Sequence, residues 1–178
     1  MRTPEANDRI QLVFSLFDAD GNGFLEPDDF ELMGTRVVAA VPGAGDAAKG
    51  ALLGSLRRYW TTLVTELDAN GDGRISPEEF TACVLNPERF AETVDEFARA
   101  LSSVGDLTGE GFVARPDFIA LMKAIGFRQP NIEALFDALG PAQGDRVAVD
   151  AWAEAIRDYY RPEKSGIAGD LLTGEAAG

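Results

Sequence analysis

One segment of this chain occurs three times without a gap. The copies are DADGNGFLEPDDF at 18–30, DANGDGRISPEEF at 68–80 and DLTGEGFVARPDF at 106–118. Each copy begins with Asp, has Gly at the fourth and sixth positions and an aliphatic residue at the eighth, and ends in an acid followed by Phe. Self-similarity of this kind indicates an array of equivalent structural units.

Apolar residues flank each copy at helical spacing. Ile10, Val13 and Phe17 precede the first copy at i, i+3 and i+7, and similar stripes precede and follow the other copies. Pro27 and Pro77 stand where an exit helix would begin, a position that tolerates a missing N–H. Each unit is therefore predicted to be a helix–loop–helix. The predicted fold is all-α, with four such units arranged in two pairs that form one compact globule.

The fourth unit is degenerate. ALFDALG at 134–140 echoes SLFDADG at 15–21, and VAVDAW at 147–152 echoes ISPEEF at 75–80. This alignment leaves three extra residues between the two echoes and places Ala151 at the twelfth position, where the other copies have an acid. We expect no metal in this loop, and expect it to persist because the third loop needs a partner.

The units divide the chain into three predicted regions. Residues 1–86 form an N-terminal pair with loops 18–29 and 68–79, and residues 87–161 form a C-terminal pair. The C-terminal pair contains loop 106–117 and the degenerate loop at about 137–151. Residues 162–178 are a C-terminal tail.

The spacing of oxygen-bearing side chains is typical of a calcium loop. Ca²⁺ takes about six to eight oxygens, and a twelve-residue loop supplies them from positions 1, 3, 5, 7, 9 and 12, with Gly at position 6 for a sharp turn. Position 7 contributes its backbone carbonyl, and position 9 often acts through water. The predicted ligands of the first loop are Asp18, Asp20, Asn22, the carbonyl of Phe24 and Asp29, with Glu26 at the water position. Those of the second loop are Asp68, Asn70, Asp72, the carbonyl of Arg74 and Glu79, with Ser76 at the water position. Those of the third loop are Asp106, Thr108, Glu110, the carbonyl of Phe112 and Asp117.

The first and third loops end in Asp, whereas the second ends in Glu. Asp29 and Asp117 are one methylene shorter than Glu79, so each could bind through one oxygen and bring the site closer to the octahedral geometry that Mg²⁺ demands. We therefore expect the Asp-terminated loops to discriminate less strongly against Mg²⁺. The third loop is expected to bind calcium, and the alternative is a loop kept only to pair with the fourth.

Loops of this kind join through short backbone bridges at position 8. Leu25 is therefore expected to face Ile75, and Val113 to face Val147. Carboxylates crowded in three loops repel one another when no cation is bound, so the metal-free protein is expected to be loosely packed.

Composition excludes several classes of function. The formal net charge is −14, which disfavours nucleic acid and anionic membranes as partners. The chain has no His, so catalysis that uses His and zinc sites ligated by His are absent. Cys83, the single cysteine, is expected to be a buried thiol in a reducing, cytoplasmic compartment. No apolar run is long enough to span a membrane, and nothing in the sequence requires more than a monomer.

The three loops carry the EF-hand pattern D-x-[DN]-x-[DN]-G-x5-E, complete in the second loop and varied in the others. The whole chain resembles the sarcoplasmic calcium-binding proteins and the calerythrin-like proteins of actinobacteria. The long interval between the first two loops and the RDYYRP segment with its Leu-bearing tail are similar to features of that family. The resemblance implies a compact four-EF-hand protein that buffers or carries calcium.

A calcium sensor and an enzyme are the two alternatives to a buffer. A sensor would expose an apolar groove and bind a target protein, but sensors use Met-rich grooves and this chain has 3 Met. Ile167, Leu171 and Leu172 of the tail would then fold back into such a groove, and the alternative is a disordered tail. No nucleophile with a base and no phosphate-binding loop is recognisable, so we do not expect an enzyme.

Overall fold

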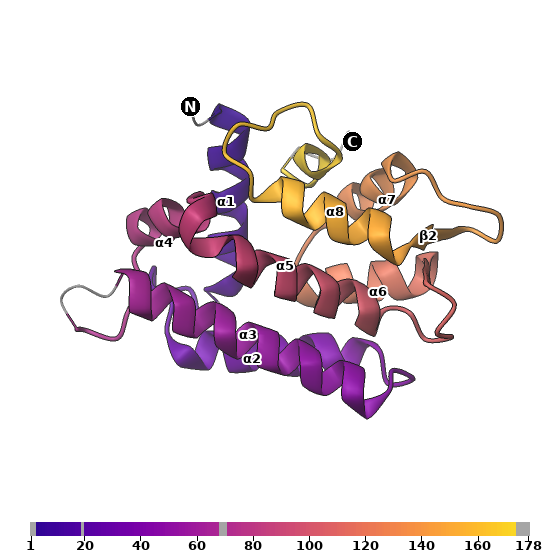
Figure 1. Ribbon diagram of the computed structural model, residues 1–178, viewed down its shortest axis with the longest axis horizontal. Helices are drawn as coiled ribbons and strands as arrows, with labels where there is room; N and C mark the ends of the chain where they lie inside the picture. The colour runs from indigo at the N-terminus through magenta and orange to yellow at the C-terminus, as the bar shows by residue number, and fades with distance from the viewer. Residues whose placement is uncertain (1–2, 19, 68–70, 174–178) are drawn as a thin grey trace.

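The computed structural model describes residues 3–18, 20–67 and 71–173 (Figure 1). The helices of the first pair are α1 (Pro4–Phe17), α2 (Pro27–Ala40), α3 (Asp46–Leu67) and α4 (Pro77–Val84). Those of the second pair are α5 (Pro87–Val104), α6 (Arg115–Ile125), α7 (Gln129–Ala138) and α8 (Val149–Tyr159). The remaining elements are the strands β1 (Phe112–Ala114) and β2 (Arg146–Ala148) and the 3₁₀ helix η1 (Ala168–Leu172). The predicted all-α fold of four helix–loop–helix units is confirmed.

The exit helices of the first pair begin where the sequence predicts. Both α2 and α4 start at a proline, Pro27 and Pro77, because proline lacks the N–H that would be unsatisfied in the first turn. Cys83 in α4 is buried, also as predicted. No helix within the described ranges is long and apolar enough to cross a membrane.

The two pairs share one core. In Figure 1, α5 runs between α3 and α8, and α2 lies against α6. Tyr59 of α3 is fully buried, and its ring packs edge-on against Phe90 and Phe97 of α5 at centroid distances of 4.8 and 5.8 Å. The N-terminal and C-terminal pairs therefore form one compact body, since helices of each pair bury aromatic side chains against the other.

Short backbone bridges join the loops at the predicted residues. Leu25 and Ile75 form an isolated antiparallel bridge, with N–H to carbonyl distances of 2.9 and 3.0 Å. Val113 lies opposite Val147 in the β1–β2 ladder. That ladder is extended at each end, since Val149 N donates to Gly111 O and Arg115 N donates to Asp145 O. The second pair of loops is therefore tied by more backbone bonds than the first.

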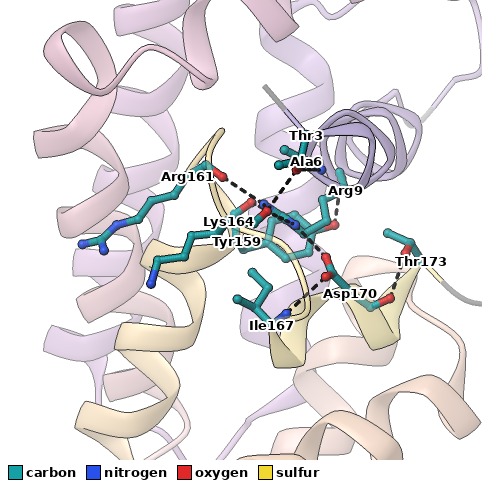
Figure 2. Close-up of polar contacts among 9 residues, drawn as sticks. All are labelled: Thr3, Ala6, Arg9, Tyr159, Arg161, Lys164, Ile167, Asp170 and Thr173. Carbon is teal, nitrogen blue, oxygen red and sulfur yellow. Dashed lines mark hydrogen bonds and ion pairs between the residues drawn. The ribbon is translucent and has the colours of Figure 1, made fainter. Parts of the chain in front are cut away.

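The tail folds back on the globule and is held by a buried arginine, Arg9 of α1 (Figure 2). The Arg9 guanidinium donates to the carbonyls of Tyr159, Arg161 and Lys164 and forms an ion pair with Asp170 at 2.6 Å. All five of its N–H groups are thereby used.

A buried leucine anchors the last described turn of the tail. Leu172 is 6% exposed, and its carbonyl accepts a hydrogen bond from Asn131 Nδ2 of α7. The prediction that the tail folds back is correct for Leu172 and wrong for Leu171, which is 42% exposed. The two residues are adjacent in η1, and its narrow turn directs their side chains to different sides.

Candidate metal centres

Three predicted ligands converge in the first loop. The carboxylates of Asp18, Asp20 and Asp29 each offer an oxygen, and these oxygens lie within 4.8 Å of one another. Asp18 ends α1 as its C-cap, whereas Asp29 lies in the first turn of α2 and is buried. Three carboxylates this close repel one another, and a hard divalent cation between them would remove that repulsion.

The backbone of the first loop supports its first ligand. Gly21 and Gly23 have φ values of 69° and 86°, which L-residues with side chains rarely adopt. The resulting turn aims the amide of Gly23 at Asp18 Oδ2, 2.9 Å away, and the amide of Asn22 at Asp18 Oδ1, 3.2 Å away. At the end of the loop, Asp29 Oδ2 accepts a hydrogen bond from Glu26 N at 2.9 Å.

The second loop is described from Gly71 onward, so the predicted ligands Asp68 and Asn70 lie outside the described residues. Asp72 Oδ1 accepts a hydrogen bond from Arg74 N at 2.9 Å. Ser76 Oγ caps α4 by accepting from Glu79 N, and Glu79 Oε2 accepts from Ser76 N at 2.9 Å. This reciprocal capping fixes Glu79 at the N-terminus of α4, where the positive end of the helix dipole favours a carboxylate.

The third loop repeats the geometry of the first. Asp106 accepts hydrogen bonds from Gly111 N at 2.9 Å and Gly109 N at 3.0 Å. Asp117 lies in the first turn of α6 and is partly buried, and this burial raises the pKa of its carboxyl. Loss of water around a carboxylate disfavours its charged form, and a cation bound beside it would favour the charged form again.

Arginines cross between paired loops, and sequence reasoning missed them. Arg74 of the second loop pairs with Glu26 at 3.0 Å, and its guanidinium lies over the ring of Phe24 at 5.8 Å. In the second pair, Arg146 is bound to Glu110 at 2.7 Å and lies over the ring of Phe112 at 4.3 Å. Glu110, a predicted ligand, is therefore engaged by an arginine of the partner loop.

A third arginine, from the third loop, binds two acids of the fourth loop. Arg115, the residue after β1, pairs with Asp137 at 2.7 Å and with Asp145 at 2.7 Å. Hydrogen bonds from this guanidinium lower the pKa of the Asp145 carboxyl. The two acids belong to the fourth loop, and the arginine belongs to the third. The sequence did contain a signal, since Arg115 follows the aliphatic position by two residues and the loop opposite is acidic.

The residues of the first and third loops fit a hard cation. They offer carboxylate, amide, hydroxyl and backbone carbonyl oxygens, the ligand types that Ca²⁺ and Mg²⁺ prefer. In the first loop, several of these oxygens already lie close together.

Four helix–loop–helix units joined in pairs by loop bridges, with acids at the ligand positions of the first three loops, are features of the EF-hand class. The EF-hand family model matches residues 10–33 and 65–85, which include the first and second loops. These two segments of the chain are EF hands. The chain is similar over most of its length to calerythrin and to the sarcoplasmic calcium-binding proteins, as the resemblance implied.

Three relatives span nearly the whole chain. Calerythrin of Saccharopolyspora erythraea is 26% identical over 168 residues, 90% of this chain and 94% of that protein. A calcium-binding protein of Streptomyces coelicolor, which was solved as a protein of prokaryotic calcium-mediated regulation, is 28% identical with a TM-score of 0.71. That match covers 89% of this chain and 99% of the other. The sarcoplasmic calcium-binding protein of amphioxus has the same fold, with a TM-score of 0.71, 20% identity and coverage of 98% and 99%.

Proposed function

We propose that this protein is an intracellular Ca²⁺ buffer or carrier that binds calcium at the first, second and third loops and leaves the fourth without metal. The observation that carries the proposal is the convergence of Asp18, Asp20 and Asp29, whose oxygens lie within 4.8 Å of one another. The calcium-binding relatives that span nearly the whole chain support the same ion.

Mg²⁺ is the proposed competitor at the first and third loops. Asp29 and Asp117 end these loops with a short carboxylate, and Mg²⁺ needs fewer ligands in a tighter octahedron than Ca²⁺. A buffer that holds Mg²⁺ at rest releases it as calcium rises, so its response to calcium is set by the rate of that exchange.

The clasped tail supports a buffer over a sensor. A sensor must expose apolar surface when calcium binds. Here Leu172 and η1 cover the apolar surface between α1 and the second pair, and the fully bonded guanidinium of Arg9 anchors the tail in place. Removal of the tail would leave a charge of that arginine buried without its partner, which is costly.

A cavity favours the sensor as the second candidate. It measures about 70 Å³, and Phe17, Met122, Trp152 and Leu172 are among the residues that line it. The S. coelicolor relative takes part in calcium-mediated regulation, and an apolar cavity beside the tail offers a place for a partner's side chain.

The remaining features of the proposal follow from composition. The net charge of −14 disfavours nucleic acid and membrane surfaces as partners, and the lone buried Cys83 suits the cytoplasm. We propose a monomer with a binding function and no catalytic activity.

Calorimetric calcium titration of the chelator-stripped protein tests the proposal, with and without millimolar magnesium. Three binding events are expected, and magnesium weakens those of the first and third loops. Glu79→Gln should remove one event and leave the magnesium-sensitive ones. Asp150→Asn, an exposed acid of the fourth loop, is the matched control and should remove none.

The same samples separate a buffer from a sensor. Fluorescence of a dye that binds apolar surface should not rise as calcium is added to a buffer, and it should fall if calcium tightens a loosely packed metal-free protein. A large rise would favour the sensor, and a single calcium event insensitive to magnesium would contradict the proposed three-site buffer.

A further inference from the structure

The sixth position of the fourth loop is occupied by an acid in an unusual backbone conformation. Val147 pairs with Val113 at the eighth position, so Asp145 corresponds to the sixth. The other loops have Gly23, Gly73 and Gly111 at this position, with φ values of 86°, 70° and 86°. Asp145 has φ of 57°, and within the described residues no other non-glycine has a positive φ. Such a residue is uncommon and is retained when surrounding contacts favour it.

The contact that retains Asp145 is a two-point ion pair with Arg115. Arg115 Nε lies 2.7 Å from Asp145 Oδ2, and Arg115 Nη2 lies 3.0 Å from Asp145 Oδ1. The backbones of the two residues are also bonded, since Arg115 N donates to Asp145 O at 3.2 Å. Parallel hydrogen bonds of this kind fix the orientation of both groups.

The same guanidinium also reaches the first position of the fourth loop. Arg115 Nη2 donates to Asp137 Oδ1 at 2.7 Å, and the sequence repeat aligns Asp137 with Asp18. The guanidinium further lies 4.4 Å from the ring centre of Phe136. Stacking on a ring adds a cation–π attraction to the ion pairs.

Arg115 thus joins positions 1 and 6 of the fourth loop, which a different contact joins in the first and third loops. In the first and third loops, the position-1 carboxylate accepts the amide of the position-6 glycine, from Gly23 to Asp18 and from Gly111 to Asp106, both at 2.9 Å. In the fourth loop, positions 1 and 6 are both acidic and are joined through the positive charge of Arg115.

We infer that Arg115 serves as the built-in cation of the fourth loop and holds it closed without metal. The fourth loop then keeps β2 in register with β1, whatever the calcium concentration. Because β1 includes Phe112, whose carbonyl is a predicted ligand, Arg115 is a positioning residue for calcium binding at the third loop. This consequence rests on the proposed calcium site there, whereas the closure of the fourth loop does not.

The substitution Asp145→Gly separates the inference from the alternative that Arg115 and Asp145 form an ordinary surface ion pair, because the two predict opposite effects on stability. Asp145→Gly introduces the residue that the other loops have at position 6, and glycine adopts the positive φ of this position without strain. If the ion pair is incidental, this variant should be more stable than the wild type. If Arg115 replaces a cation, Asp145→Gly should loosen the fourth loop, since Arg115 loses its two-point partner.

The experiment uses the full chain and the variants Arg115→Gln, Asp145→Gly and Arg99→Gln. Arg99 is the matched control, because it is an exposed arginine whose ion pair, with Asp95, lies within the single helix α5. The first readout is amide hydrogen exchange of Val113 and Val147 in chelator. Exchange should be faster in Arg115→Gln and Asp145→Gly and unchanged in Arg99→Gln. Slower exchange or a higher melting temperature in Asp145→Gly would overturn the inference.

The second readout is a calcium titration followed by the amide resonances of Gly111 and Gly23. In Arg115→Gln, the dissociation constant at Gly111 should rise by about 10- to 100-fold, the usual effect of losing a residue that supports a ligand. The constant reported by Gly23 should not change. Equal affinity at Gly111 in the variant and the wild type would refute the positioning role.

Failure of the proposed calcium site and failure of the inference about Arg115 give different results. If the Gly111 resonance of the wild type does not respond to millimolar calcium, the proposed third site is wrong, and the chelator readout still decides the role of Arg115. If Arg115→Gln unfolds the second pair, Arg115→Lys keeps the charge without the two-point geometry and should show intermediate exchange. Wild-type exchange in Arg115→Lys would show that charge alone suffices, and would overturn the two-point arrangement.

Discussion

The guanidinium of Arg9 lies 2.6 Å from the carboxylate of Asp170, and this contact ties the first helix to the last turn of the described chain (Figure 2). The side chain of Arg9 is 0% exposed and that of Asp170 is 20% exposed. Because the Arg9 guanidinium is buried and all of its N–H groups are bonded, neither water nor another group competes for them. The contact therefore fixes the position of the tail.

Arg9→Met keeps the apolar stem of the side chain and removes the charge. The carbonyls of Tyr159, Arg161 and Lys164 lose their donor, and Asp170 loses its ion pair. The free energy of unfolding should fall by about 3–5 kcal/mol, as for other broken buried pairs. Urea denaturation in excess calcium measures it.

Arg36→Met is the control for this change, since Arg36 is exposed, and it should alter stability by less than about 0.5 kcal/mol. If Arg9→Met lowers the free energy of unfolding no more than Arg36→Met does, the Arg9 network contributes nothing to stability.

Adjacent leucines of the tail should differ sharply in their contribution to stability. Leu172→Ala removes a side chain from the core and should cost about 2–5 kcal/mol, because a cavity remains after the truncation. Leu171→Ala truncates a side chain that is 42% exposed and should cost less than about 0.5 kcal/mol. Thermal melts of both variants check the prediction, and a larger loss for Leu171 would mean that η1 is seated the other way round.

Lengthening the last ligand of the first loop should change its choice of ion. Asp29→Glu restores the reach needed for two-oxygen coordination, so calcium affinity relative to magnesium should rise by about tenfold, on the order of one added ligand oxygen. Calorimetry with each ion measures this ratio. Asp28→Glu makes the same change at the exposed neighbour and should leave the ratio unchanged. An unchanged ratio in Asp29→Glu would show that its length does not set selectivity.

The three tyrosines should resist ionisation in the folded protein. Burial raises the pKa of Tyr160 to about 12, and burial also raises the pKa values of Tyr59 and Tyr159 well above their usual range. An unfolded phenol ionises near pH 10, so the unfolded state loses protons that the folded state keeps, and stability falls as pH rises above 10. Phenolate absorbance should therefore appear together with unfolding. A phenolate signal near pH 10 with intact helical circular dichroism would contradict the burial of these rings.

Removal of metal should affect the bridge between the first two loops. Leu25 and Ile75 are joined by an isolated bridge next to the carboxylates of the first loop, which repel one another without a cation. Calcium at one hundred times its dissociation constant should stabilise this region by about 2.7 kcal/mol, which corresponds to roughly hundredfold slower amide exchange. Exchange of the Leu63 amide, deep in α3, serves as the internal reference. Equal exchange of Leu25 in calcium and in chelator would argue against metal binding at these loops.

Local pattern was enough to predict the helices and the bridges between loops. Pro27 and Pro77 begin helices because of a property of proline itself, and Leu25 meets Ile75 because the loop repeat places both at position 8. Such features depend on residues close in sequence, where period and turn chemistry are informative.

The arginine contacts could not be predicted in the same way. Arg9 lies on the apolar stripe of α1 beside Ile10 and Val13, a position that signals burial but does not identify Asp170 as its partner. Glu110 carries the side chain of a ligand, yet its bond to Arg146 depends on how two loops face each other. These contacts join residues far apart in the chain, and their geometry follows from the packing of whole helices.

The Arg9 network also sets the order in which the protein can be completed. Its acceptors, from Tyr159 to Asp170, are synthesised about 150 residues after Arg9 of α1. Contacts between such distant residues form late, because a long loop must close before they are gained. Arg9 therefore has none of these acceptors while the four helix–loop–helix units are being made, and the packing around it is completed only after residues 159–170 have followed.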